Sequence, residues 1–460
     1  MAAPSRHDSA LLRDAAEAAI AHVVGLAERS ATPTAEAVAA LAAFDEALPD
    51  GPESHGVADT LRLLADLGGP AAMGSAGPHY YGFVNGATLP AALGASFLAD
   101  AWDQNAALPV MSPIAARLHD VSARWLLELF DLDRSTDVAF VTGATVANAT
   151  CLAAARDTLL AEAGWDVQRD GLFGAPEIDV VIGERAHSTL SKSLGLVGLG
   201  RDRVTIVPAD DQGRLIAAQL PDVPAGRPLL VCAQAGEVNT GAFDPFADIV
   251  EWAAERSGWV HVDGAFGMWA LADPGRASLV NGLRDVDSLA TDGHKWLNVT
   301  YDCGIAFVRR PGALRRTFAA VAGYLPPEEG FEAMHHTPQS SQRARQIEVW
   351  AVLRSLGRDG VAELVRRACD CAALIAERIA GVSGIEVLND VVLNQVLVRC
   401  IDGPTTERLV AELQRDGRIW CGPTQWDGAT AMRISVSSWQ TTLDDAAHAA
   451  DVIADCAAKV

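Results

Sequence analysis

Lys295 is the residue of this sequence with the clearest capacity for chemistry. It stands in DGHKWLN (residues 292–298), between two short apolar runs, 287–291 and 304–308, that have the pattern of buried strands. Burying an ammonium group is costly unless its charge is paired or removed. Condensation with an aldehyde to a Schiff base removes the charge, so Lys295 is a candidate covalent catalyst. A surface lysine at the end of a strand is the alternative at this point.

A carboxylate ends a second apolar run. GWVHVDGAFG (258–267) predicts a buried strand that finishes at Asp263, and the small residues after it keep the loop close to whatever Asp263 faces. Such a carboxylate needs a cationic partner or good hydrogen-bond donors. A protonated pyridine nitrogen would serve, and the salt bridge would keep the ring able to accept electrons. Together with Lys295, this pattern indicates pyridoxal phosphate (PLP).

Two more strand ends carry polar or small residues. VAFVTGATVANAT (138–150) predicts a strand, a glycine turn and a helix, with Ala144 and Thr145 at the helix N-terminus, where free amides bind anions. The turn is not a Walker loop, since no Gly-Lys-Ser/Thr follows. In DVVIGERAHSTL (179–190), His187 falls at a turn after another strand. There it either faces the site or caps a helix in solvent.

The elements that must position these residues alternate along the chain. Strand-like and helical stretches through the middle predict an α/β fold with a mainly parallel sheet. Before them, apolar residues at helical spacing predict helices at 9–26, 34–48 and 57–67. Their wide apolar stripes fit packing on a partner subunit or on the same chain.

Residues 77–108 form a glycine-punctuated segment with aromatic and polar side chains before a helix. Such a segment suits the wall of a ligand site or a packed aromatic turn, and the sequence leaves both interpretations open. The candidate substrate-binding residues are His79, Tyr80, Tyr81, Phe83, Asn85 and Trp102.

Composition limits the partners and the compartment. The formal charge of −23 argues against nucleic acid or an anionic membrane surface as a partner. The eight cysteines form no C-x-x-C pair, and we expect neither a disulfide framework nor a metal site. The N-terminus lacks a signal-peptide core, and no run approaches the roughly 20 apolar residues of a membrane span. We therefore expect a cytoplasmic protein.

HVDGAFG (261–267) and TDGHKWLN (291–298), with the strand ends at Thr145 and His187, closely resemble the group II PLP-dependent amino-acid decarboxylases, in the bacterial branch similar to aromatic-L-amino-acid decarboxylase. The resemblance runs from about residue 77 to the end. It implies fold type I of the PLP-dependent transferases, with a large PLP-binding domain (77–345) around a mainly parallel, seven-stranded-type sheet. A small C-terminal α/β domain (346–460) and an N-terminal helical segment (1–76) complete it. It also implies a homodimer with active sites at the interface.

The resemblance implies a role for each candidate residue. Lys295 forms the Schiff base with PLP, Asp263 pairs with the pyridine nitrogen, and His187 stacks on one face of the ring. Asn148 matches an asparagine of related sequences, with a structural role as the alternative. The remaining implied cofactor contacts are Ala265 on the other ring face, and Ala144, Thr145 and His294 at the phosphate.

The implied reaction is decarboxylation of an L-amino acid to its amine through an external aldimine and a quinonoid, which an acid then protonates. Relatives supply that proton from a loop tyrosine, in a D-Y-T-P motif. This chain reads His335-His336-Thr337-Pro338, so His336 is the predicted acid, and Tyr324 lies too early in the loop. A solvated histidine pair is the alternative. The change leaves open an aldehyde-forming enzyme or an aminotransferase, and, in another class, a catalytically silent dimeric scaffold.

Overall fold

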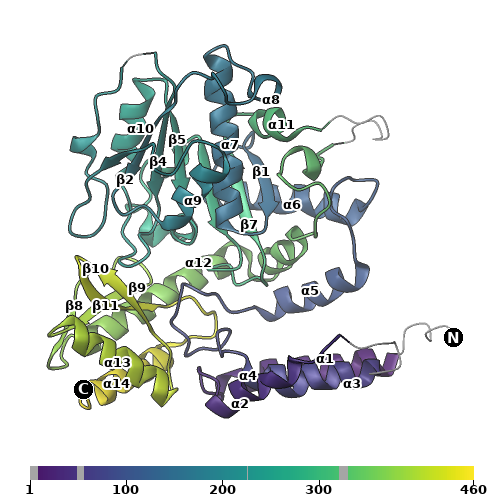
Figure 1. Ribbon diagram of the computed structural model, residues 1–460, viewed down its shortest axis with the longest axis vertical. Helices are drawn as coiled ribbons and strands as arrows, with labels where there is room; N and C mark the ends of the chain where they lie inside the picture. The colour runs from purple at the N-terminus through teal and green to yellow at the C-terminus, as the bar shows by residue number, and fades with distance from the viewer. Residues whose placement is uncertain (1–8, 49–55, 225, 321–329) are drawn as a thin grey trace.

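The structure is a computed structural model that describes residues 9–48, 56–224, 226–320 and 330–460. Figure 1 shows a large sheet with helices on both faces, a smaller sheet beside its lower end, and a row of helices below. Tyr324 lies outside the described residues. So do two stretches of the N-terminal helical segment, 1–8 and 49–55.

The N-terminal helices are α1 (Ser9–Val24), α2 (Ala35–Ala40), α3 (Val57–Leu63) and α4 (Gly69–Ala71). The prediction of three helices is confirmed in outline, but α2 is shorter than expected because a 3-10 turn follows it at Leu41–Phe44. No residue of α1 is buried, and Leu12 and Val24 are 63% and 76% exposed. Within one chain, the apolar stripe of α1 is therefore left largely uncovered.

The large sheet contains β1 (Asp137–Val141), β2 (Asp179–Gly183), β3 (Thr205–Val207), β4 (Leu229–Gln234), β5 (Trp259–Asp263), β6 (Ser288–Asp292) and β7 (Gly304–Val308). The spatial order is β1-β7-β6-β5-β4-β2-β3. β7 alone runs opposite to the other six strands, which are parallel to one another. The strands other than edge strand β3 are almost fully buried apolar runs, as expected for a parallel sheet covered on both faces. The predicted α/β class is confirmed.

Helices form the two outer layers (Figure 1). On one face α7 crosses β1, β5, β6 and β7, with α9 and α11 beside it. Successive residues of β6 enter opposite cores: Leu289 packs in the cluster with α6, α10 and α12, and Ala290 in the cluster with α7. The helices of these layers are α5 (Pro90–Trp102), α6 (Pro113–Phe130), α7 (Ala144–Glu162), α8 (Val167–Asp170), α9 (Ser188–Leu196), α10 (Phe246–Ala254), α11 (Ala313–Phe318) and α12 (Gln346–Ile379).

The C-terminal part forms an antiparallel sheet in the order β10-β11-β9-β8. α12 links it to the large sheet, since α12 packs against α5 and α6 as well as against α14. The predicted boundary at residue 346 falls at the start of α12, and the division into domains stays a prediction. The elements are β8 (Ile385–Val387), β9 (Gln395–Cys400), β10 (Gly422–Trp426), β11 (Ala429–Ser435), α13 (Gly403–Asp416) and α14 (Leu443–Ala457).

The strand directions bring the chemistry-bearing residues to one edge. β1, β2, β4, β5 and β6 are mutually parallel, so their carboxyl ends, followed by the candidate residues, meet at the same edge of the sheet. Among the described residues, no helix has the length and hydropathy needed to cross a membrane. The predicted cytoplasmic location stays a prediction.

Candidate active site

A cavity of about 340 Å³ opens at the carboxyl edge of the large sheet. Residues after β1, β2, β4, β5 and β6 line it, because the parallel strands deliver their loops to this edge. All seven residues predicted to contact the cofactor are among them: Ala144, Thr145, His187, Asp263, Ala265, His294 and Lys295. The structure thus brings together residues that are up to 151 positions apart in the sequence.

Asp263 is 6% exposed at the end of β5. Its Oδ1 accepts the backbone N–H of Ala265 over 3.1 Å, and its Oδ2 accepts the side-chain amide of Asn148 over 2.9 Å. The two donors fix the orientation of the carboxylate. Its oxygens have further lone pairs, so at the wall of this cavity it can accept one more donor from a bound ligand.

A chain of hydrogen bonds runs behind Asp263. Because Asn148 donates to Asp263, its side-chain oxygen must accept, so Nε2 of His261 donates to it over 2.9 Å. Nδ1 of His261 then accepts from the Ser288 hydroxyl, which itself accepts the indole N–H of Trp259. Burial lowers the pKa of His261 to about 4, so the ring is neutral near pH 7. Each donor in this series of hydrogen bonds therefore directs its proton toward Asp263.

His187 is the N-cap residue of α9. Its Nδ1 lies 2.6 Å from the Thr189 hydroxyl and accepts the Thr189 backbone N–H over 3.3 Å. Burial is the main cause of its lowered pKa, so the ring is neutral near pH 7. The same ring caps the helix and lines the cavity, but it is not solvated as the capping interpretation expected. Its role at a cofactor stays a prediction.

Lys295 follows β6 and is partly buried, with a side chain that is 20% exposed. Its Nζ lies 3.4 Å from Oδ2 of Asp292 and 5.9 Å from the centre of the Phe266 ring. His294 lies beside it, and its Nδ1 accepts the backbone N–H of Cys303 over 3.1 Å. The chain has only three lysines, and the other two, Lys192 and Lys459, are exposed.

The segment predicted as a ligand wall packs directly on the lysine turn. A Cβ on Gly86 would come within 1.9 Å of the Lys295 carbonyl oxygen, so only glycine permits this approach. Asn298, fully buried and in the left-handed region at φ 55°, joins the two segments. Its side-chain oxygen accepts the N–H groups of Ala87 and Trp439, and its amide donates to the Trp296 and Ser437 carbonyls.

The candidate substrate residues take different places. Phe83 and Asn85 shortly precede Gly86: Phe83 is 61% exposed and contacts Trp420, which also stacks on Tyr80. The Asn85 side-chain oxygen accepts the hydroxyl of Tyr301, whose ring lies 4.2 Å from that of His294. The aromatic wall consists of Tyr80, Phe83, Tyr301 and Trp420, which come from three separate parts of the chain.

None of the six candidates is among the residues that line the cavity, and three of them have other surroundings. Tyr81 is fully buried, and its hydroxyl points to the Asp445 carbonyl. His79 pairs with the Asp445 carboxylate over 2.9 Å. Trp102 ends α5 and is 44% exposed. The sequence pattern could not separate Tyr80 from Tyr81, because adjacent residues in an irregular loop carry no periodic signal.

His336 also lies away from the cavity of its own chain. Its ring stacks on Phe331, which stacks in turn on His119, and Nε2 of His119 bonds to the Val138 carbonyl. Val138 is near the start of β1, whereas the cavity begins after its end, about 13 Å further along the strand. Burial lowers the pKa of His336. Within one chain, His336 and Lys295 do not share a site.

Two functional groups had weak signals in the sequence. His261 precedes Asp263 by two residues, so it faces the same side of β5, and a histidine inside an apolar strand requires a buried partner. Tyr301 follows the lysine turn closely, and its closeness to His294 comes from the return of the chain into β7.

The cavity fits a phosphate-bearing aldehyde with a pyridine ring. An amine stands at one strand end, and a carboxylate fixed by two donors stands at the next. Small residues open α7, and a Cβ on Gly143 would come within 3.3 Å of the His294 ring, so a larger residue would fill this corner. No group of three or more potential metal ligands occurs among the described residues.

Comparisons with known proteins agree with this geometry. A family model described as the pyridoxal-dependent decarboxylase conserved domain matches residues 43–401. L-2,4-diaminobutyrate decarboxylase from Rhizobium meliloti (strain 1021) is 28% identical over 382 residues, which are 78% of this chain and 72% of that protein. Tyrosine decarboxylase from Oryza sativa subsp. japonica is 30% identical over 368 residues, 74% of this chain and 66% of that protein.

A solved structure, Oryza sativa TDC with PLP and tryptamine, superposes with a TM-score of 0.91 at 22% identity. The superposition covers 100% of this chain and 99% of that one. At this level of identity, the likeness shows the fold, which is the one that the sequence predicted.

Proposed function

The chain belongs to the pyridoxal-dependent decarboxylase family, whose members are amino-acid carboxy-lyases that use PLP, and we propose that it converts an L-amino acid into its amine and carbon dioxide. One observation carries the proposal: Lys295, Asp263 and His187 line a single cavity, and the first residues of α7 line it as well. A catalytically silent scaffold would not need this set of residues.

PLP supplies an aldehyde that joins amines and a protonated pyridine ring that takes up the electron pair left by a departing carboxylate. Lys295 would be the amine that holds it. Asp263, fixed by Asn148 and the Ala265 amide, would accept the pyridine N–H and keep that nitrogen protonated. His187, with its imidazole fixed by Thr189, would contact the ring.

The start of α7 would provide the contacts to the phosphate group. The backbone N–H groups of Ala144 and Thr145 open a helix of 19 residues, and its dipole favours an anion there. His294 adds its Nε2–H, because its Nδ1 is already occupied as an acceptor. Phe266, whose ring centre lies 5.9 Å from Nζ of Lys295, and Val238 add apolar surface to the same cavity.

The proton that completes amine formation comes from His336 of a second subunit in this proposal. His336 stacks on Phe331 near the start of β1, too far from the Lys295 of its own chain to serve there. A homodimer with its active sites at the interface offers the loop of one chain to the cavity of the other.

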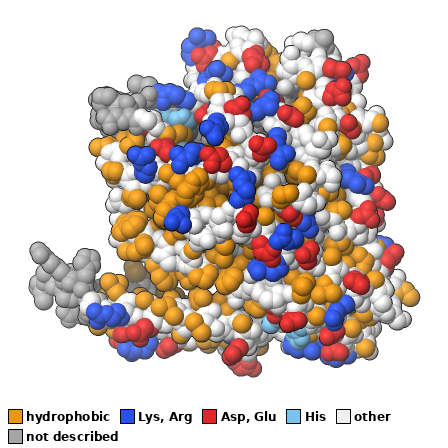
Figure 2. Space-filling view, turned by 180° about the vertical axis from the view of Figure 1, so that it is seen from behind, with side chains coloured by type: hydrophobic (Ala, Val, Ile, Leu, Met, Phe, Trp, Pro, Cys, Tyr) orange, Lys and Arg blue, Asp and Glu red, His pale blue; other side chains and the backbone are white. Residues whose placement is uncertain are grey.

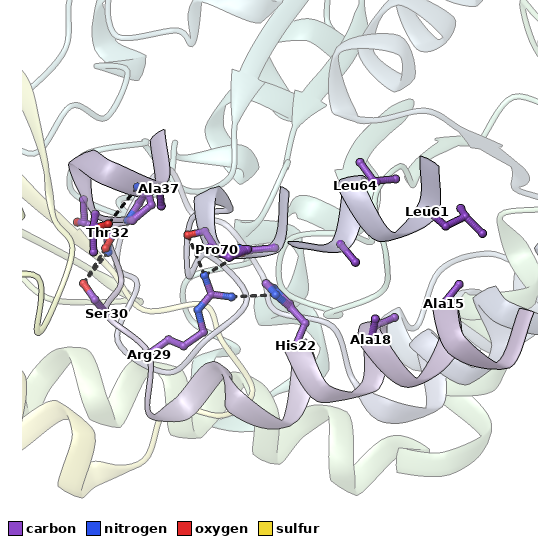
Figure 3. Close-up of a pocket in the computed structure, with 15 residues that line it drawn as sticks. Ala15, Ala18, His22, Arg29, Ser30, Thr32, Ala37, Leu61, Leu64 and Pro70 are labelled. Carbon is purple, nitrogen blue, oxygen red and sulfur yellow. Dashed lines mark hydrogen bonds between the residues drawn. The ribbon is translucent and has the colours of Figure 1, made fainter. Parts of the chain in front are cut away.

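The N-terminal helices support such a dimer. A groove of about 720 Å³ lies between α1, α3 and the residues around Pro70, lined by alanine and leucine side chains together with polar ones (Figure 3). Arg29 spans it, bonding to His22 and to the Gly69 carbonyl. Seen from behind, apolar side chains continue along these helices at the lower edge of the molecule (Figure 2). A partner subunit would cover surface that one chain leaves exposed.

The aromatic wall favours a substrate with an aromatic side chain. Phe83 and Tyr301 are both 61% exposed, the Tyr301 ring packs on His294 next to Lys295, and Asn85 adds a polar group. Such a wall offers ring stacking together with a hydrogen-bonding group.

The function is tested with the holoenzyme and the common amino acids, one at a time, with and without oxygen. Carbon dioxide, amine, aldehyde and peroxide are recorded. Equal amounts of carbon dioxide and amine are expected, with the largest rate for an aromatic amino acid. Carbon dioxide with aldehyde would favour the aldehyde-forming alternative, which the histidine at position 336 motivates. Keto acid formed only with an added acceptor would indicate an aminotransferase.

A further inference from the structure

Asp292 holds a position that the proposed function does not use. It is the last residue of β6, three residues before Lys295, and its side chain is 4% exposed. Its Oδ1 accepts the backbone N–H of Ala144 over 2.6 Å, and its Oδ2 lies 3.4 Å from Nζ of Lys295. A carboxylate buried this deeply needs such partners, so these contacts fix its place.

His294 completes the surroundings of this carboxylate. Its Nε2 lies 3.5 Å from Oδ1 of Asp292. Because Nδ1 accepts the Cys303 amide, a neutral ring carries its proton on Nε2, on the side of Asp292. Burial lowers the pKa of His294, so the neutral ring is the form present near pH 7. An amide, an imidazole N–H and an ammonium group therefore surround one carboxylate.

These donors are the ones that a phosphorylated cofactor needs. The first amides of α7 and His294 are the proposed phosphate contacts, and Lys295 is the proposed cofactor amine. A helix start offers few free amides. Asp292 already takes that of Ala144, and a phosphate placed beside it would also meet a like charge.

We propose that Asp292 occupies the phosphate corner, that is, the start of α7 together with His294. There its carboxylate accepts the Ala144 amide and holds Lys295 until a phosphate group displaces it or shares the corner. The inference rests on the proposed function, because it takes the start of α7 as the phosphate site. Asp292 is then a positioning residue: it keeps the lysine directed into the corner at the expense of phosphate affinity.

The test is a binding measurement on the full-length protein stripped of cofactor. Pyridoxamine 5′-phosphate has the phosphate and the pyridine ring but no aldehyde, so it reports on the corner without the bond to Lys295. Its Kd and that of inorganic phosphate are measured by titration calorimetry. Asp292→Asn removes the charge and keeps the shape, and Asp292→Ala also frees the Ala144 amide. Both variants are expected to bind both ligands at least about fivefold more tightly.

Asp263→Asn is the matched control, because it removes a carboxylate from the same cavity and leaves the contacts of the Ala144 amide unchanged. It should weaken pyridoxamine 5′-phosphate and leave inorganic phosphate unchanged. Thermal unfolding followed by circular dichroism checks that each variant is folded. Unchanged or weaker binding of both ligands by the two folded Asp292 variants would overturn the inference alone. If the unaltered protein binds no pyridoxamine 5′-phosphate, the proposed function fails, and the inference fails with it.

Discussion

Asn148 donates its side-chain amide to Oδ2 of Asp263 over 2.9 Å, and this contact links the first turns of α7 to the end of β5. Both residues are buried, and the Asn148 oxygen is already committed to His261. The orientation of Asp263 toward the cavity therefore depends on a residue that does not line it.

Replacing Asn148 with alanine should destabilise the protein and weaken the cofactor site. The variant leaves one oxygen of a buried carboxylate without its donor, which costs about 2–3 kcal/mol of unfolding free energy. Urea denaturation of the cofactor-free protein measures the loss, and titration with PLP measures the affinity. Thr150→Val is the control, since the Thr150 hydroxyl bonds only within α7, to the Val146 carbonyl. Equal effects of the two substitutions would contradict a specific role for Asn148.

The buried histidine behind Asn148 predicts a pH dependence of stability. The pKa of His261 is about 4 in the folded protein against 6.5 for a free histidine, so the unfolded chain binds the extra proton between these values. Stability should therefore fall as the pH drops from about 6.5 to about 4, with a contribution from this residue of about 3 kcal/mol.

Urea denaturation at several pH values between 4 and 7 tests this, with His261→Gln as the comparison. Glutamine can donate to Asn148 but takes up no proton in this range. The unfolding free energy of the variant should fall less steeply with decreasing pH. The difference in slope should correspond to at most one bound proton. A slope identical to that of the unaltered protein would show that His261 does not titrate as its burial requires.

The position of His336 predicts that two chains share each active site. Lys295→Ala and His336→Phe chains, co-expressed with different tags and purified as a mixed dimer, contain one complete site if the loop acts across the interface. Such a dimer should form amine at about half of the wild-type rate.

The matched control is a dimer of one unaltered chain and one chain carrying both substitutions. It has no complete site if His336 acts across the interface, so its amine formation should be as low as that of His336→Phe. Activity in this control, with none in the mixed single variants, would place His336 in its own chain's site. Full amine formation by His336→Phe itself would remove it from the mechanism.

The exposed stripe of α1 predicts the main contact of the dimer. Ile20 is 51% exposed, and a charge there should raise the dimer Kd at least about tenfold. Sedimentation of Ile20→Asp at several concentrations measures this. Phe173→Asp is the control, because Phe173 is 97% exposed but follows α8, on the far side of the molecule from α1 (Figure 1). A monomeric wild-type protein, or equal dissociation of both variants, would contradict the assignment.

Much of the candidate site could be predicted from the sequence because parallel strands follow a simple rule. Asp263, Lys295 and His187 each follow an apolar run, and the carboxyl ends of such runs meet at one edge of the sheet. The hydrogen-bond chain from Trp259 to Asp263 could not be predicted, because it needs the pairing of Val262 with Leu289, which brings β5 and β6 side by side.

Loops follow no such rule. The sequence makes the adjacent residues Tyr80 and Tyr81 equal candidates for the site. Only Tyr80 stacks on Trp420, which lies 340 residues later. The sequence motif predicts His336 as the proton donor. Its distance from Lys295 becomes evident only in the fold, where it lies near the start of β1. Long-range packing decides both cases, and periodicity carries no information about it.

The central claim is that Lys295 is the amine that binds PLP in this decarboxylase, and the chain allows a direct test because it contains only three lysines. Borohydride converts the bond between a lysine and a bound aldehyde into a stable amine. The reduced holoenzyme is digested, and the added mass is located by mass spectrometry. The account predicts that the mass lies on Lys295 alone and is lost, together with carbon dioxide release, in Lys295→Ala. Label on Lys192 or Lys459, or label and carbon dioxide release that persist in Lys295→Ala, would contradict it.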